Sequence, residues 1–165
     1  MAYTNFEFYK ATFCGDLFTE GNSFKRWEQR ASDYMDTITF MRLQDGLPTD
    51  GWCNDRVQKC VCALAEIFYQ LRIAQDNAFK AMQGVEVADK DDRGVKSKSS
   101  GSESITYMTG AEMSSGAKEW SAIYGAAGSQ RATNDLLLQT ATEYLSSVCG
   151  DDGVNLLFAG VRYVR

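Results

Sequence analysis

Residues 24–41, FKRWEQRASDYMDTITFM, contain the pattern that decides the fold class. Their apolar side chains recur every three or four positions, which is typical of an α-helix that buries one face. The predicted buried face consists of Phe24, Trp27, Ala31, Tyr34, Ile38 and Met41, and the predicted polar face includes Lys25, Arg26, Glu28, Gln29, Arg30, Asp33 and Asp36. Asn22 or Ser23 can cap the start of this helix, and Gly46 and Pro48 mark its end.

A second helix is predicted from the same spacing, at Val57, Cys60, Leu64, Ile67, Leu71, Ala74, Ala78 and Met82. Asn54 is its predicted N-cap and Gly84 its predicted C-terminal stop. A continuous helix of this length spans about 45 Å. Neither apolar face can be buried alone, so we predict that helices 24–41 and 57–82 pack antiparallel in one core.

Two further segments are predicted to complete this core. A third helix begins near Thr133 or Asn134 and stops at Gly150, with an apolar face of Leu137, Ala141, Tyr144, Leu145 and Val148. The start of the chain is dense in aromatic residues: Tyr3, Phe6, Phe8, Tyr9 and Phe13. We interpret it as a first helix or arm packed on the core, with a free binding surface as the alternative. Residues 110–128 are rich in Gly, Ala and Ser and support no assignment.

Residues 85–104, VEVADKDDRGVKSKSSGSES, have almost no side chain to bury and are predicted to form a long polar loop. The basic residues Lys90, Arg93, Lys96 and Lys98 could follow a phosphate backbone. Acidic residues are interleaved with them, which favours a solvated loop that faces a channel or another subunit. Ile105 and Tyr107, which follow it, alternate with Thr106 and predict a short strand or extended arm.

The C-terminal segment is apolar and follows a loop signal at residues 151–153. It carries Leu156, Leu157, Phe158, Val161, Arg162 and Tyr163. Such a segment either folds back on its own bundle or docks on a partner, because exposure of this much apolar surface is costly. Our hypothesis is docking as an added strand on a partner, so that deletion of residues 154–165 leaves a folded subunit.

These elements predict a mainly α protein, a small helical bundle with a long polar loop, a short β-prone arm and an extended C-terminal tail. The predicted organisation is one helical domain, residues 1–150, followed by a docking tail, residues 151–165. The 165 residues suffice for one ordinary domain, and 44% of them are hydrophobic and 24% charged, which is typical of globular proteins. The first residues lack the basic and apolar pattern of a secretory signal, so we expect a cytoplasmic or particle-packaged protein.

The chemistry available to this chain is limited, and we expect neither an enzyme nor a cofactor or metal site. The sequence has no His, which excludes Ser–His–Asp and Cys–His nucleophile systems. It contains no phosphate-binding GxxxxGK[ST] or GxGxxG motif. The paired carboxylates Asp33 and Asp36 are interpreted as a solvated helix face rather than a metal site. The net charge of −5 argues against binding that depends on neutralising phosphates.

The five cysteines are interpreted as reduced, buried and unreactive thiols. They are Cys14, Cys53, Cys60, Cys62 and Cys149. Cys60 and Cys62 are two positions apart, so on a helix they point in nearly opposite directions and cannot hold one metal.

Five segments, taken in order, resemble the small head–tail connector (adaptor) proteins of phages and prophages of Gram-positive bacteria. They are the aromatic opening YTNFEFYKATFCG, the helix SFKRWEQRASDYMDTITFMRL, the helix VQKCVCALAEIFYQ, the segment GSESITYM and the C-terminal LLFAGVRYV. The likeness covers about two-thirds of the chain. The sequence departs from the family at residues 110–128, which are longer and richer in Gly, and at Phe40–Met41, where Phe-Gly is common.

This resemblance implies a structural subunit of the virion neck, assembled in the host cytoplasm. Such subunits form a homo-oligomeric ring, usually dodecameric, below the portal protein. The ring extends the DNA channel without sequence-specific DNA binding and joins the capsid to the next head-completion (stopper) or tail protein. The alternatives are a small cytoplasmic helical adaptor that binds another partner through its apolar C-terminal tail, or, from a different class, an enzyme that uses carboxylates and thiols.

Overall fold

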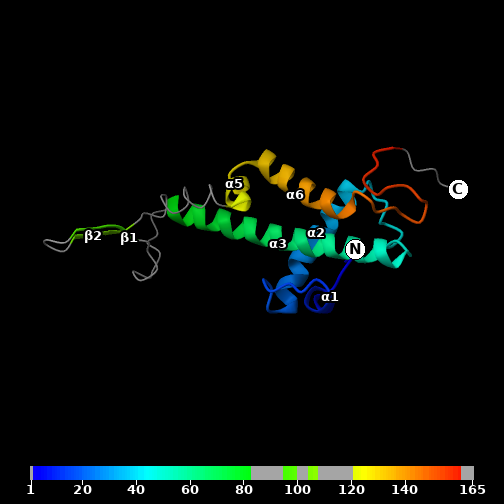
Figure 1. Ribbon diagram of the computed structural model, residues 1–165, viewed down its shortest axis with the longest axis horizontal. Coiled ribbons are helices and arrows are strands. Elements are labelled where there is room, and N and C mark those ends of the chain that lie inside the picture. The colour runs from blue at the N-terminus through cyan, green and yellow to red at the C-terminus, as the bar shows by residue number, and fades with distance from the viewer. Residues whose placement is uncertain (1, 83–94, 100–103, 108–120, 161–165) are drawn as a thin grey trace. The chain divides into compact units, whose positions relative to one another are not determined.

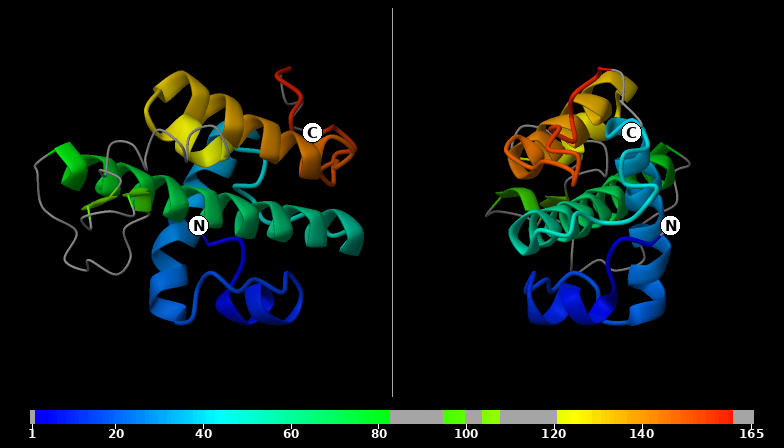
Figure 2. Two further views of the ribbon diagram at one scale, coloured as in Figure 1. Left: turned by 60° about the vertical axis from the view of Figure 1, so that its left-hand side comes forward. Right: turned by 90° about the vertical axis from the view of Figure 1, so that its right-hand side faces the viewer.

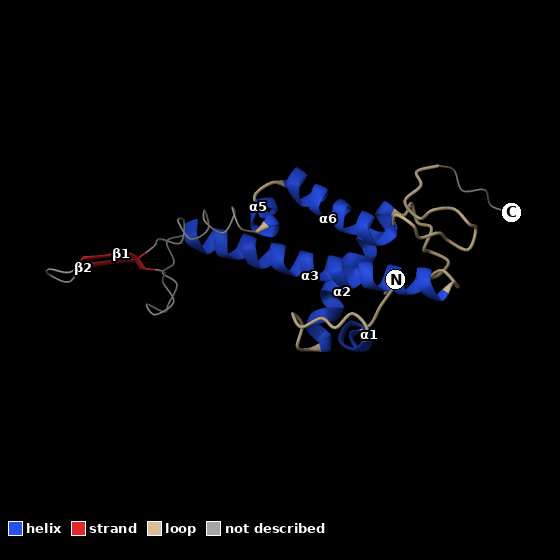
Figure 3. Ribbon diagram, viewed as in Figure 1, coloured by secondary structure: helices blue, strands red, loops and turns tan. Residues whose placement is uncertain are grey.

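The computed structural model describes residues 2–82, 95–99, 104–107 and 121–160, and it is mainly helical (Figures 1 and 3). Its elements within these residues are α1 (Phe6–Ala11), α2 (Gly21–Ile38), α3 (Gly51–Met82), β1 (Val95–Ser99), β2 (Ser104–Tyr107), α5 (Ala122–Ala127) and α6 (Gln130–Leu145). They divide into two compact units, residues 1–69 with 134–165, and residues 70–133. The predicted mainly α fold class is confirmed.

Helix α2 buries the face that its spacing predicts, with one addition and one correction. Phe24, Trp27 and Ala31 are buried as predicted, and Met35, which lies outside the predicted stripe, is fully buried too. Met41 lies beyond the end of the helix and is half-exposed. Glu28, predicted to be solvated, is only 2% exposed. The predicted polar face is therefore wrong at Glu28, because the start of the chain covers this carboxylate.

The N-terminal residues reach α2 through a buried polar network. The Tyr3 backbone N–H donates to Glu28 Oε1 (3.0 Å), and the Ser32 hydroxyl donates to the same oxygen (2.6 Å). The Tyr3 hydroxyl donates to Asp36 and to the Leu43 carbonyl oxygen. Burial, followed by the hydrogen bond to Asp36, raises the pKa of Tyr3. These bonds satisfy polar groups that would destabilise the core if left unpaired.

The aromatic opening forms a helix packed on the core, as predicted. Asn5 caps α1 by accepting a hydrogen bond from the Phe8 N–H (2.8 Å). The fully buried Tyr9 ring packs against Phe24, with ring centroids 4.7 Å apart, and against Phe18 at 5.5 Å. Gly15 permits this packing, because a Cβ atom there would lie 2.1 Å from the Tyr9 ring.

In the unit of residues 1–69 and 134–165, helix α3 is buried on more than the single face that its spacing predicts. Its buried residues there include the predicted Val57, Cys60 and Leu64 and, in addition, Val61, Cys62, Ala65 and Phe68. The helix starts at Gly51, and Asp50 Oδ2 accepts the Cys53 N–H (2.9 Å), so Asp50 takes the capping role predicted for Asn54.

Helix α2 crosses α3 steeply and does not lie along it (Figure 2), so the predicted antiparallel packing is wrong. The two helices contact each other near Met35 and Cys60, whose sulfur atoms are 3.6 Å apart. Antiparallel packing needs one continuous matched stripe on each helix. Here α2 divides its buried residues between α3 and the aromatic cluster at Tyr9, so its contact with α3 is short.

Helix α6 contributes Leu137, Ala141 and Leu145 to the core, as predicted, and begins at Gln130, slightly earlier than expected. The chain then turns back: Cys149 pairs with Asn155 in an isolated antiparallel bridge, and the Leu156 N–H donates to the Val148 carbonyl oxygen (3.0 Å). Leu156 is fully buried in the core of its own chain, and Leu157 packs against that core. The prediction that Leu156 docks on a partner is therefore wrong, and the predicted role of Leu157 stays a prediction.

The unit of residues 70–133 contains the later part of α3, the strands and α5. Strand β1 pairs antiparallel with β2, and Lys98 lies opposite Ile105 in the register. The predicted strand at residues 105–107 is confirmed, whereas residues 95–99, predicted to be loop, form its partner strand. Pairing explains the difference, because a polar segment without its own core can still exchange backbone hydrogen bonds.

Candidate assembly surface

Arg42 lies between the end of α2 and the C-terminal segment, and its side chain is only 4% exposed. Its Nη2 donates to the carbonyl oxygens of Phe158 and Gly160, each at 3.1 Å. Its Nη1 lies 3.4 Å from Asp152 Oδ2. A side chain at position 160 would collide with the Phe158 ring, because a Cβ atom there would lie 2.0 Å from it. Arg42 and Gly160 together set the path of the described end of the chain.

Helix α2 ends in a Schellman motif without glycine. The Phe40 N–H donates to the Thr37 carbonyl oxygen (3.3 Å), and the Met41 N–H donates to the Asp36 carbonyl oxygen (2.8 Å). Phe40 and Met41 both adopt left-handed backbone conformations, with φ of 53° and 59°. Side chains destabilise this conformation by about 1–2 kcal/mol per residue.

Replacing Met41 with Gly is expected to raise the free energy of unfolding by about 1 kcal/mol, because glycine adopts a positive φ without the clash. Met41→Ala is the matched control, since it removes the same side chain and keeps the Cβ atom. Urea denaturation followed by circular dichroism measures both variants. If Met41→Gly is no more stable than Met41→Ala, backbone strain at this position is excluded.

The strained turn and Arg42 place three large apolar side chains on the surface: Phe40 (53% exposed), Met41 (49%) and Phe158 (56%). We call this group, with the buried Arg42 that positions it, the Arg42 surface. Among the predicted docking residues that the structure describes, Leu156, Leu157 and Phe158, the last is exposed. Met41 was missed because it fits the end of the predicted buried stripe, and Phe40 was not predicted as a site residue. Val161, Arg162 and Tyr163 lie outside the described residues.

A second exposed group lies where α3 meets the end of α6. Arg56 donates from Nε to the Tyr144 carbonyl oxygen (3.1 Å) and from Nη2 to that of Glu143 (2.7 Å). A cation at this position satisfies carbonyl groups of the last helical turn. The guanidinium lies near the rings of Tyr144 and Trp52, and Trp52 is 55% exposed.

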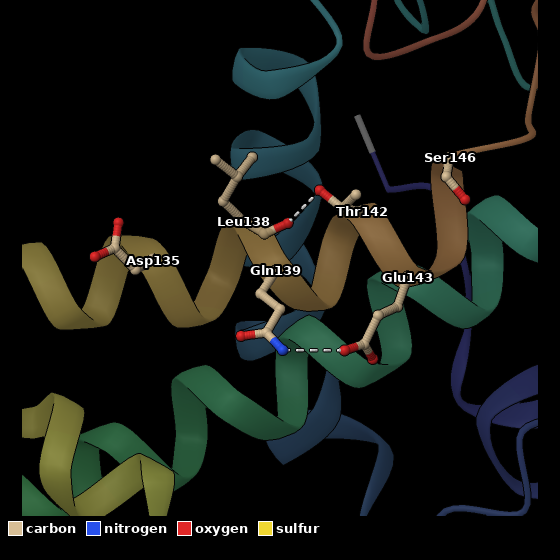
Figure 4. Close-up of a pocket in the computed structure, with 6 residues that line it drawn as sticks. All are labelled: Asp135, Leu138, Gln139, Thr142, Glu143 and Ser146. Carbon is tan, nitrogen blue, oxygen red and sulfur yellow. Dashed lines mark hydrogen bonds between the residues drawn. The ribbon is translucent and has the colours of Figure 1, made fainter.

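The outward face of α6 forms a shallow pocket (Figure 4). It is lined by Asp135, Leu138, Gln139, Thr142, Glu143 and Ser146. Leu138 is 49% exposed and lies between two carboxylates, Asp135 three residues before it and Glu143 five residues after it. The Gln139 side-chain amide donates to Glu143 Oε1 (3.4 Å). The sequence predicted the buried face of α6, and the residues that line the pocket lie on the other, mainly polar face of the same helix.

Four of the six residues predicted to face a channel or another subunit lie within the described part of the chain. Lys90 and Arg93 lie outside the described residues. Lys96 and Lys98 belong to β1, and Ile105 and Tyr107 belong to β2. Tyr107 lies opposite Val95 in the antiparallel register. Their role in a channel or subunit interface stays a prediction.

The cysteines differ in their surroundings. Burial raises the pKa of both Cys60 and Cys62 to about 12, so these thiols stay protonated at neutral pH, as predicted for buried cysteines. Cys14 is exposed, contrary to the general expectation of burial, and Cys53 and Cys149 are half-buried. Within the described residues, no group of three or more Cys, Asp or Glu is placed to hold a metal ion.

The described helices include none that is both long and apolar enough to span a membrane. Comparison of the chain with known protein families, with curated proteins and with solved structures finds no match.

Proposed function

We propose that this chain is a structural subunit of a phage head–tail connector ring, which sits below the portal and joins the capsid to the next neck or tail protein. Five segments that occur in the same order along the sequence as in this family support the proposal. The helical bundle also supports it, because its large buried side chains pack in the core. In this role the chain performs no catalysis and passes DNA through a channel.

The observation that carries the proposal is the Arg42 surface. Exposed clusters of large apolar side chains are typical of protein–protein contacts. Phe40 and Met41 lie in a strained turn, and Arg42 fixes the backbone next to the exposed Phe158 side chain by donating to the carbonyl oxygens of Phe158 and Gly160. Backbone strain at exposed apolar residues is often linked to function, so the strained turn at Phe40 and Met41 favours an assembly role over a free monomer.

Native mass spectrometry of the purified chain, alone and with the portal protein of the same phage genome, tests the proposal. We expect a closed ring, or a ring that forms on the portal. Phe158→Ser is expected to weaken assembly about tenfold or more, because a buried aromatic side chain contributes about 1.5–3 kcal/mol. Leu17→Ser is the matched control, since Leu17 is an exposed apolar residue outside the Arg42 surface.

Three outcomes separate the readings. Loss of the ring in Phe158→Ser places the Arg42 surface between copies of the chain, and loss of portal binding with the ring intact places it against the portal. A chain that stays monomeric alone and with the portal contradicts the connector role and favours the small helical adaptor.

A further inference from the structure

Two cysteines lie at the junction between the start of α3 and the segment that follows α6. These segments lie side by side in each view of the molecule (Figures 1 and 2). Thr49 joins them, because its backbone N–H and its hydroxyl both donate to Asp151 Oδ1, at 2.8 and 2.9 Å. Cys53 lies in the first turn of α3, and Cys149 precedes the turn that contains Asp151.

The local backbone at both cysteines is fixed. Asp50 Oδ2 accepts the Cys53 N–H at 2.9 Å, and Cys149 is paired with Asn155. Cys149 also belongs to the surroundings of Cys53. Burial raises the pKa of Cys53, the nearby N–H of Cys149 lowers it, and negative charge on Asp50 and Cys149 raises it. Cys53 and Cys149 thus flank the Thr49–Asp151 contact, four residues after Thr49 and two residues before Asp151, and both thiols are free and half-buried.

The other three cysteines lack such a neighbour or are inaccessible. Cys60 and Cys62 are fully buried, and their side chains leave α3 in different directions. Cys14 is exposed on the turn after α1, where its Sγ lies 3.9 Å from the Ala11 carbonyl oxygen. A small oxidant in solution therefore has one accessible pair, Cys53 with Cys149, and one accessible single thiol, Cys14.

We propose that Cys53 and Cys149 are a redox pair that closes into a disulfide in oxidising surroundings and thereby joins the start of α3 to the segment after α6. A low-molecular-weight disulfide serves as the oxidant. One cysteine thiolate attacks it and releases one small thiol, and the second thiolate then attacks the protein sulfur of the mixed disulfide and releases another. The two cysteines lose two protons and two electrons, and the oxidant gains both. This inference is independent of the connector role.

Such a bond closes a long loop that contains most of α3 and all of α6. Crosslinking restricts the unfolded chain far more than the folded one, because the junction is already held by Thr49 and Asp151. Oxidation is expected to raise the midpoint of thermal unfolding by at least about 5 °C.

Peptide mapping of the intact protein after incubation with oxidised glutathione tests the proposal. Free thiols are then alkylated, and the unreduced protein is digested with trypsin. The chain offers a clean readout, because the cysteines fall on separate tryptic peptides: 43–56 holds Cys53, 132–162 holds Cys149, 11–25 holds Cys14, and 60–72 holds Cys60 and Cys62. The expected product is peptide 43–56 linked to 132–162, lighter by two hydrogen atoms than the sum of the two.

Cys53→Ser and Cys149→Ser are each expected to abolish the linked peptide and the rise in the unfolding midpoint, while Cys14→Ser keeps both. Circular dichroism checks that the serine variants fold. If a variant does not fold, the peptide map of the oxidised wild-type protein alone tests whether Cys53 and Cys149 are linked. Recovery of 43–56 and 132–162 only as separate alkylated or glutathione-bound peptides overturns the proposal. So does linkage of either peptide to 11–25.

Discussion

Truncation after Gly153 is expected to unfold the helical core and not to leave a stable subunit without its tail. The deletion removes Leu156, which is fully buried, and loss of a buried leucine side chain alone destabilises a core by about 2–5 kcal/mol. It also removes the Phe158 and Gly160 carbonyl groups and leaves the buried Arg42 guanidinium without these partners. Loss of a hydrogen bond to a charged group adds a further cost of about 1.5–3 kcal/mol for each bond. Far-ultraviolet circular dichroism with thermal and urea denaturation measures the loss.

Deletion of residues 161–165 alone is the matched control. It keeps Leu156 and both carbonyl groups bound by Arg42, so we expect the unfolding midpoint to stay close to that of the full chain. Cooperative unfolding of the longer truncation at an unchanged midpoint contradicts the assignment of residues 154–160 to the core.

Tyr9→Phe is expected to lower the free energy of unfolding by about 2–4 kcal/mol without changing the shape of the aromatic cluster. The Tyr9 hydroxyl donates to Glu66 Oε1 (2.6 Å) and accepts the N–H groups of Leu17 (3.0 Å) and Phe18 (3.3 Å). Phenylalanine leaves all three groups without this partner, two of them backbone donors next to a fully buried ring. Tyr69→Phe is the matched control, because the half-buried Tyr69 ring packs against the same Phe18.

The same variant tests a dependence on alkaline pH. Burial and the hydrogen bond to Glu66 raise the pKa of Tyr9 to about 12, above its usual value of 10.0. The hydroxyl therefore contributes its full stabilisation below pH 10 and loses it as pH rises towards about 12, because the unfolded chain releases the proton first. Urea denaturation at several pH values measures the gap between wild type and Tyr9→Phe. A gap that stays constant between pH 9 and 12 contradicts this account.

Most of the Arg42 surface could not be predicted from the sequence. The C-terminal segment was predicted as a unit, yet the structure divides it: Leu156 enters the core, and Phe158 is exposed. Met41 fits the three-and-four spacing of the predicted buried face, so nothing local separates it from buried residues. The resemblance to the connector proteins carries a signal for the positive φ at Met41, because Phe-Gly is common at this point in those proteins.

The sequence by itself determined α2, α3, α6 and much of their buried faces, because hydrophobic periodicity acts over one or two turns and does not depend on distant residues. Phe24, Ala31, Val57, Leu64 and Leu137 are buried as that periodicity predicts. Only the tertiary structure decided that α2 crosses α3, that Tyr3 covers Glu28, and that Arg42 holds the C-terminal segment. Each of these depends on two segments far apart in the chain meeting at hydrogen-bond distance, and a contact of that kind leaves no periodic trace in either segment.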